Sequence, residues 1–231
     1  MITWKERIKH LVPVSVLNSL LLTFPSLYRT RLVRYESNLS DQSGIDDLLA
    51  QLGQVIHAEG DIIECGSSRC GSAIIMANYL RERNVPKLIY ACDSFRGFLP
   101  AELEREKKAG LTTTPPGAFT STSLEYVRKK IRRLGAEESV IPVPGFFQDT
   151  LPHVKSAFCL ALIDCDLSQS LVYAAETVWP SVVKDGRMLF DDYASTEFRG
   201  ARLGIEHFVG RHASEISERG LLNRLYYIRK R

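Results

Sequence analysis

The sequence has no uninterrupted apolar run of about 18 residues or more, so it contains no clear transmembrane helix. Neither sign of charge is in large excess, because 30 Lys and Arg are balanced by 27 Asp and Glu, which leaves a formal net charge of +3. This balance gives no support to nucleic-acid binding through a strongly basic surface. Disorder is excluded as well, since 45% of the 231 residues are hydrophobic. The length fits one larger α/β domain or at most two small ones.

Cysteines are few and show no spacing typical of a paired motif. There are five cysteines, an odd number, and no Cys-x-x-Cys spacing occurs among them. A disulfide framework or a zinc site is therefore not expected. Cys92, Cys159 and Cys165 lie in or beside apolar runs, where cysteine behaves as a small hydrophobic residue. We expect a reducing, cytoplasmic environment.

The basic residues gather near the start of the sequence. Residues 1–40 carry six Lys and Arg but two Glu, so the remainder is mildly acidic. The apolar run from Leu11 to Phe24 follows the first basic residues and is too short to span a bilayer. We predict a basic amphipathic helical arm over 1–40, packed on the main domain or on a second subunit, and a main domain over 41–231. Peripheral contact with an anionic membrane surface and a cleaved signal peptide are the alternatives.

From about residue 45 onward, helical and strand-like patterns alternate. Strands are predicted at 61–65, 87–92, 139–143, 158–163 and 187–190, with a last strand or hairpin arm at 221–228. Helices are predicted at 45–56, 71–83, 122–134, 168–183 and 197–211. Residues 94–121, rich in Gly, Pro and Thr, are predicted to be one long loop, and such loops are usually functional lids or disordered. The alternation predicts an α/β fold, a mostly parallel sheet with helices on both faces.

The helix predicted over 122–134 has two marked features. Thr122 to Glu125 is a capping-box pattern that would open it. Arg128 to Arg133 is a basic run, which we interpret as a solvated helix face. A phosphate-bearing or membrane partner for this run is the alternative.

Acidic residues follow four of the five predicted strands. Ligands in parallel sheets bind at the carboxyl ends of the strands, so these positions are candidates for a site. Glu64 is followed by Gly66, which lets a ligand approach the backbone closely. Asp93 ends the second strand and could accept two hydrogen bonds from a ribose diol. The spacing from Glu64 to Asp93 also suits NAD, although the full Gly-x-Gly-x-x-Gly pattern of dinucleotide sites is missing.

Three further aspartates follow the fourth and fifth strands, namely Asp164, Asp191 and Asp192. Brought together, their carboxylates would repel one another and raise one another's pKa. A hard cation would remove that repulsion, and all-oxygen ligands suit Mg²⁺, with Ca²⁺ or Mn²⁺ as alternatives. The structural alternative is that these aspartates cap the helices that start just after the strands.

Five motifs now make the sequence recognisable. They are IIECGSSRCGSAI (62–74), DSFRG (93–97), GFFQDTLP (145–152), DCDL (164–167) and DDY (191–193). In this order they resemble the motifs of the macrocin O-methyltransferase family. Members of that family are class I S-adenosylmethionine-dependent enzymes with a Rossmann-like fold that methylate sugar hydroxyls of antibiotics, use Mg²⁺ and often form dimers.

The resemblance implies roles for individual residues. It places Asp164 as the general base and Asp164, Asp191 and Asp192 as the metal ligands. It places the following residues around S-adenosylmethionine: Glu64, Cys65, Gly66, Ser67, Asp93, Ser94, Phe146 and Phe147. Phe146 and Phe147 would line the adenine side, or would alternatively belong to the core.

Two positions depart from the family pattern. Ser168-Gln169-Ser170 stands where members commonly have Tyr-Glu-Ser, so a glutamate beside the metal is missing. Cys70 replaces a usual glycine. The first departure bears on the identity of the acceptor, and neither removes a predicted metal ligand.

We therefore expect a Mg²⁺-dependent O-methyltransferase that acts on a hydroxyl of a sugar or glycoside. A catechol-type acceptor is the alternative within the same chemistry. A non-catalytic cofactor-binding scaffold and an NAD-binding domain are alternatives of other classes. We expect a small-molecule substrate, a homodimer and no nucleic-acid partner.

Overall fold

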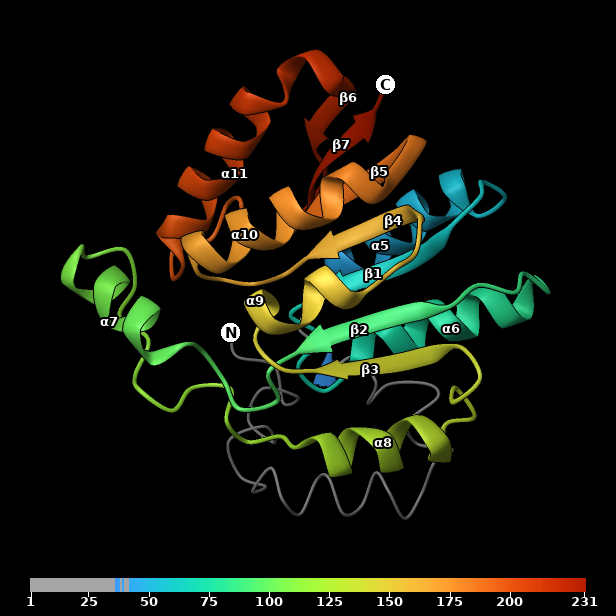
Figure 1. Cartoon of the computed structure of the whole chain (residues 1–231), viewed down its shortest axis with the longest axis horizontal. Coiled ribbons are helices and arrows are strands. Elements are labelled where there is room, and N and C mark those ends of the chain that lie inside the picture. Colours follow the sequence, from blue (N-terminus) through green and yellow to red (C-terminus); the bar gives the residue numbers. More distant parts are fainter. Residues whose placement is uncertain (1–35, 38, 40–41) are drawn as a thin grey trace, which may run out of the picture.

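The computed structural model describes Glu36, Ser37, Leu39 and residues 42–231 (Figure 1). The strands are β1 (Asp61–Cys65), β2 (Ile89–Asp93), β3 (Val140–Pro144), β4 (Phe158–Ile163), β5 (Val182–Phe190), β6 (Ile216–Leu221) and β7 (Tyr226–Lys230). They form one sheet in the order β3-β2-β1-β4-β5-β7-β6. The first five strands pair in parallel, whereas β7 runs antiparallel between β5 and β6. The predicted arm over 1–40 lies outside the described residues except for the three named above.

Helices cover both faces of the sheet, as predicted. They are α5 (Gln42–Val55), α6 (Gly71–Glu82), α7 (Pro100–Lys108), α8 (Leu124–Arg133), α9 (Phe147–Thr150), α10 (Ser168–Val178) and α11 (Arg199–Arg211). Apolar side chains of α5, α6 and α8 form one core cluster with the sheet, and those of α10 and α11 form the other. The Rossmann-like α/β fold expected from the sequence is confirmed.

The two cores follow from the alternation of side chains along each strand. In β1, Ile62 belongs to the core beneath α5 and α6, whereas Ile63 belongs to the core beneath α10 and α11. Every residue of β4 is buried, which is typical of a parallel strand covered on both faces. The uninterrupted apolar sequence Phe158–Ile163 therefore marks the centre of the sheet.

Strand and helix positions agree well with the sequence predictions, with instructive exceptions. The strands predicted at 61–65 and 158–163 are confirmed with the same bounds. The last predicted strand, 221–228, contains the end of β6, the connection and the first residues of β7. The prediction of one continuous loop over 94–121 is wrong, because α7 forms inside it. Pro100 occupies the first turn of α7, where its missing N–H costs nothing. α7 has few apolar residues and therefore lacks the periodic stripe by which helices are predicted.

The basic run at Arg128–Arg133 is not entirely solvated. Lys130 is one of the largest fully buried side chains of the described residues. The helix also begins one residue later than its capping-box pattern indicated, since Ser123 is the N-cap and accepts from the N–H of Tyr126 at 3.2 Å. The solvated-face interpretation is therefore wrong for Lys130.

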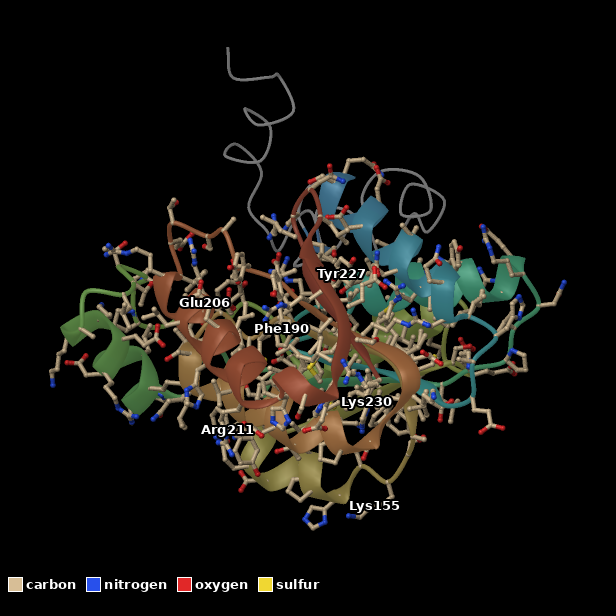
Figure 2. The ribbon with its side chains drawn as sticks, turned by 90° about the horizontal axis from the view of Figure 1, so that it is seen from above. Lys155, Phe190, Glu206, Arg211, Tyr227 and Lys230 are labelled. Atoms are coloured by element: carbon tan, nitrogen blue, oxygen red, sulfur yellow. The ribbon has the colours of Figure 1, made fainter. Side chains whose placement is uncertain are left out.

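Seen from above, the β6–β7 hairpin and α11 lie towards the viewer, with Tyr227 and Lys230 on β7 and Glu206 and Arg211 on α11 (Figure 2). Lys230 Nζ donates to the carbonyls of Trp179 and Val182, both at 2.8 Å. These bonds fasten the antiparallel hairpin to the edge of the parallel sheet. None of the described helices combines the length and the apolar character needed to cross a membrane.

Candidate functional site

The loop after β1 is built around a glycine. Gly66 has a φ of +94°, and a Cβ at this position would lie 1.7 Å from the carbonyl oxygen of Asp164. Any other residue would therefore push β1 and β4 apart at their carboxyl ends. The loop stays in place because the amides of Gly66 and Ser67 donate to the carbonyl of Cys92, at 2.8 and 3.3 Å.

Asp93 at the end of β2 also holds this loop. Its carboxylate accepts from the N–H of Ser68 at 2.8 Å and from the N–H of Phe95 at 2.6 Å. Burial raises the pKa of Asp93, although these two backbone bonds oppose the rise. Each carboxylate oxygen keeps a further lone pair, so the group can still accept from a ligand hydroxyl.

A pocket opens at the carboxyl ends of β1, β2 and β3, and it contains five of the eight predicted cofactor residues. Its lining includes Gly66, Asp93, Ser94, Phe146 and Phe147. The remaining three, Glu64, Cys65 and Ser67, are fully buried and do not line the pocket. The structure also adds Phe98 and Phe119 of the 94–121 segment to this pocket, and neither stood out in the sequence.

Glu64 lies directly behind the pocket. Burial raises its pKa to about 7, and a hydrogen bond from the Ser72 hydroxyl opposes the rise. Its second carboxylate oxygen is buried and has no hydrogen-bond partner among the described residues. An unpaired buried carboxylate oxygen is costly when it is ionised, which agrees with the raised pKa of this group.

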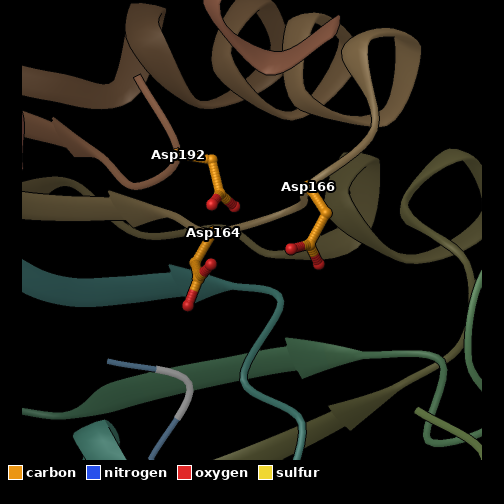
Figure 3. A group of neighbouring side chains, drawn as sticks. All are labelled: Asp164, Asp166 and Asp192. Atoms are coloured by element: carbon orange, nitrogen blue, oxygen red, sulfur yellow. The ribbon is translucent and has the colours of Figure 1, made fainter. Parts of the chain in front are cut away.

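Three carboxyl groups converge where β4 and β5 end (Figure 3). Asp164, Asp166 and Asp192 each offer one oxygen within 4.8 Å of the others. The second carboxylate oxygen of Asp164 is buried and has no partner among the described residues. The cluster contains two of the three predicted metal ligands, and its third member, Asp166, is not in the predicted set. Its place two residues after Asp164 was the available signal.

Crowding of like charges is visible in the pKa values of the cluster. Burial and then the neighbouring Asp191, Asp166 and Asp192 carboxylates raise the pKa of Asp164 well above its usual range. Burial and then the Asp191 carboxylate raise the pKa of Asp192 to about 6. A group of acids that resists ionisation in this way is suited to a bound cation, which removes the repulsion.

Asp191, the third predicted metal ligand, has a different partner. Its two oxygens accept from Nε and Nη2 of Arg224, at 2.7 and 2.6 Å. The backbone of Arg224 is held in turn by Asp47 of α5, which accepts from its N–H at 2.7 Å. A Cβ on Gly44 would lie 2.9 Å from Cδ of Arg224, so this glycine makes room for the arginine. The resemblance-based ligand set and the observed cluster thus share Asp164 and Asp192 and differ in the third carboxylate.

The helix-capping alternative for the aspartates does not describe this structure. The N-cap residues of α10 and α11 are Leu167 and Phe198, and neither caps through its side chain. The start of α10 is capped from α7 instead. Glu102 accepts from the N–H of Ser170 at 2.8 Å, and Glu106 accepts from the N–H of Ser168 at 2.6 Å.

A second, larger cavity of about 530 Å³ adjoins the first. The two share Ser68, Phe119, Asp164 and Asp166 as lining residues. Charged groups dominate its wall: Glu36, Arg69, Asp164, Asp166, Asp191, Asp192, Glu197 and Arg224. Acids outnumber bases there, and each arginine already has an acidic neighbour, Glu36 for Arg69 and Asp191 for Arg224. The cavity therefore has an excess of negative charge that would favour hydroxyl-bearing or cationic ligands.

Sequence comparisons show which known proteins this chain resembles. A protein-family model described as Macrocin-O-methyltransferase (TylF) matches residues 42–219. A tetracenomycin-C 4'-O-methyltransferase of Streptomyces olivaceus, which acts on a dimethoxyrhamnosyl derivative by its name, is 29% identical over 165 residues. The demethyldecarbamoylnovobiocin O-methyltransferase of Streptomyces niveus is 29% identical over 140 residues. These alignments include 66% and 58% of this chain but 59% and 53% of the two relatives.

Solved structures share the fold. The O-methyltransferase NovP superposes with a TM-score of 0.70 at 19% identity, over 94% of this chain and 99% of that one. The calicheamicin methyltransferase CalS11 superposes with a TM-score of 0.68 at 18% identity, over 99% of this chain and 94% of that one. At these identities the likeness concerns the fold, which is the one predicted.

Proposed function

The chain belongs to the macrocin O-methyltransferase family, and from this premise we propose that it transfers the methyl group of S-adenosylmethionine to a sugar hydroxyl of a small molecule. One observation carries the proposal. Asp164 lines both the cofactor pocket and the adjoining cavity, and one oxygen of its buried carboxylate has no hydrogen-bond partner among the described residues. A base at this junction can reach an acceptor hydroxyl while the methyl donor occupies the other side.

The cofactor would lie in the pocket at the ends of β1, β2 and β3. Asp93 and Gly66 line this pocket, where Asp93 would accept from the ribose hydroxyls and Gly66 would let the backbone of the loop lie against the ligand. Ser94, Phe146 and Phe147 would line the remaining wall, whereas Glu64, Cys65 and Ser67 would support the loop from behind.

A divalent cation fits the carboxylate cluster. We propose Asp164, Asp166 and Asp192 as the residues that hold it, because their oxygens converge and one oxygen of Asp164 has no hydrogen-bond partner within the described part of the chain. Oxygen-only ligands of this kind suit Mg²⁺. A cation bound there would supply the positive charge that lowers the pKa of an acceptor hydroxyl.

The side chains of this chain then have distinct tasks. Asp164 accepts the proton of the acceptor hydroxyl, and the oxygen attacks the methyl carbon in line with the departing sulfur. Arg224 forms an ion pair with Asp191 beside the cluster. Phe98 and Phe119, in edge-to-face contact with their ring centroids 5.1 Å apart, would form an apolar part of the cofactor pocket wall.

A sugar is favoured over a catechol as the acceptor because the cavity wall is polar and acidic rather than apolar. The name of the Streptomyces olivaceus relative supports this choice, since it specifies a substrate that carries a dimethoxyrhamnosyl group. A cytoplasmic location, supported by five buried free cysteines, and a homodimer, supported by the family resemblance, complete the proposal.

Calorimetry with S-adenosylhomocysteine, with and without Mg²⁺, tests the function. Binding with a Mg²⁺-dependent enthalpy in the presence of a sugar acceptor is expected. An absence of S-adenosylhomocysteine binding would contradict the methyltransferase assignment. Binding without methyl transfer to any glycoside or catechol would favour the scaffold alternative.

A further inference from the structure

A buried ion cluster lies beside the cavity and uses residues to which no role has yet been given. It consists of Glu36, Arg69, Tyr126 and Lys130, and we name it the Glu36 cluster. Lys130 Nζ lies 2.7 Å from Oε2 of Glu36, with side-chain exposures of 0% and 1%. Arg69 Nη1 lies 3.6 Å from Oε1 of Glu36, and the Tyr126 hydroxyl donates to the same carboxylate at 2.9 Å.

Burial of this kind costs free energy. Desolvation lowers the pKa of Lys130, and the Glu36 carboxylate opposes that effect. A buried ion pair is often no more stabilising than an apolar pair of equal volume, because both charges lose their hydration. The Glu36 cluster is therefore better explained by the geometry that it fixes than by the stability that it adds.

That geometry is the conformation of the loop after β1. Lys130 Nζ donates to the backbone carbonyl of Arg69 at 2.8 Å. The residues on either side, Ser68 and Cys70, are both in the left-handed region, with φ of 45° and 54°. Non-glycine residues in this region are strained and persist where the surroundings hold them. The hydrogen bond from Lys130 therefore holds the loop at the carbonyl between the two strained residues.

The Glu36 cluster also reaches the cavity and the 94–121 segment. Glu36 and Arg69 line the cavity wall. Arg69 Nη2 donates to the hydroxyl of Ser121 at 2.8 Å and to its carbonyl at 3.1 Å. A single side chain of the loop thus contacts both the start of the described chain and the end of the segment over the site.

The residues at Glu36 and Ser37 are seated closely against the first turn of α6. A Cβ on Gly71, the first residue of α6, would lie 2.5 Å from the backbone nitrogen of Ser37. Backbone at that distance cannot yield as a flexible side chain would. Gly71 therefore provides the space in which residues 36–37 pack against α6. Its φ is ordinary, so a left-handed conformation is not the reason for a glycine here.

We propose that Glu36 and Lys130 are positioning residues that lock the loop after β1 in its cofactor-binding conformation. Residues 36–37, which precede the domain boundary expected at residue 41, are then part of the functional unit. They contact Arg69, which lines the acceptor cavity and follows Ser68, a residue that lines both the cavity and the cofactor pocket. This inference rests on the cofactor site proposed above.

The test uses a pair of substitutions with a matched control on the same helix. The variant Glu36→Gln/Lys130→Met removes both buried charges together, so that neither is left alone in the core. The control Glu125→Gln/Lys129→Met removes an exposed pair with a 2.6 Å separation and side-chain exposures of 77% and 59%. Tyr126→Phe is a milder variant that removes one donor to Glu36 and leaves the charges in place.

Two readouts apply to each folded variant. The first is amide hydrogen exchange of residues 66–71 without cofactor, and the second is the Kd of S-adenosylhomocysteine by calorimetry. We expect the buried-pair variant to exchange at least tenfold faster in this loop and to bind about tenfold more weakly than the control, with Tyr126→Phe in between. A structural role alone would lower Tm and leave both readouts at the control value, and this outcome would overturn the inference. Loop exchange is measured without cofactor, so it separates this inference from the proposed function.

Discussion

The guanidinium of Arg224 donates to both carboxylate oxygens of Asp191, from Nε at 2.7 Å and from Nη2 at 2.6 Å. This two-pronged ion pair gives Asp191 a fixed protein partner next to the convergent carboxylates of Asp164, Asp166 and Asp192. Two neighbouring aspartates that look equivalent in the sequence therefore have different environments. The difference leads directly to a prediction about metal binding.

Replacing Asp166 with Asn should weaken Mn²⁺ binding at least tenfold, because it removes an oxygen of the convergent cluster. Asp192→Asn should do the same. Asp191→Asn should have a smaller effect on Mn²⁺ and should lower stability instead, since Arg224 loses its charged partner. Electron paramagnetic resonance of Mn²⁺ titrations measures these affinities without any turnover. A larger effect of Asp191→Asn than of Asp166→Asn would assign the third ligand position to Asp191.

Asp164→Asn should reduce the rate of methyl transfer by about 10² to 10⁴, the usual contribution of a general base. The affinity for S-adenosylhomocysteine should change little, because most of the cofactor pocket is formed by other residues. Single-turnover rates together with calorimetry separate the two effects. Methyl transfer at the original rate would remove Asp164 from the role of base.

Asp192→Asn should stabilise the cation-free protein at pH 7.5. Burial and the Asp191 carboxylate raise the pKa of Asp192 from 3.8 to about 6 in the folded state. The folded protein then binds this proton more tightly than the unfolded chain, so stability falls as the pH rises from about 4 to 6. The substitution removes that loss and should add on the order of 1–2 kcal/mol to the free energy of unfolding at pH 7.5.

The gain should vanish below about pH 4, where both states are protonated. Urea unfolding in the presence of EDTA at several pH values measures it. Asp185→Asn is the control, because Asp185 is half exposed and forms a surface ion pair with Arg229. A gain of equal size at pH 4 and pH 7.5 would show that charge is not its cause.

Glu102→Ala should destabilise the protein by about 1–3 kcal/mol, because a buried cap of α10 is lost. Both oxygens of Glu102 accept from Ser170, one from its N–H at 2.8 Å and one from its hydroxyl at 2.5 Å. Glu104→Ala, on the same helix but exposed and paired with Lys108, should cost less than about 1 kcal/mol. Equal losses for the two variants would argue against the capping role.

Much of the fold was accessible from the sequence because parallel strands buried on both faces are continuous apolar runs. Phe158–Ile163 is such a run and was predicted with the bounds that the structure has. Asp61–Cys65, whose apolar centre is Ile62 and Ile63, was also predicted with its observed bounds. α7 was not predicted, since its buried positions are largely the carboxylates of Glu102 and Glu106 rather than an apolar stripe. Those glutamates are satisfied by the first turn of α10, a partner more than sixty residues away that no local pattern reveals.

The candidate site was likewise predictable in part. Gly66, Asp93 and Asp164 could be named because a parallel sheet puts the ends of its strands at one edge, whatever the details of packing. The direction of each side chain could not be named. Asp166 turns towards the cluster and Asp191 towards Arg224, and the placement of Arg224 depends on the hairpin loop that Asp47 holds.

The sequence by itself thus determined the α/β fold, the edge of the sheet at which the site lies and the acidic character of that site. Short-range periodicity and the alternation of strands and helices along the chain are sufficient to predict these three features. Only the tertiary structure decided which carboxylates converge, that Lys130 is buried, and that Glu36 and Ser37 belong beside the cofactor loop. These outcomes depend on contacts between distant segments, whose free energies are set by burial and geometry rather than by residue type.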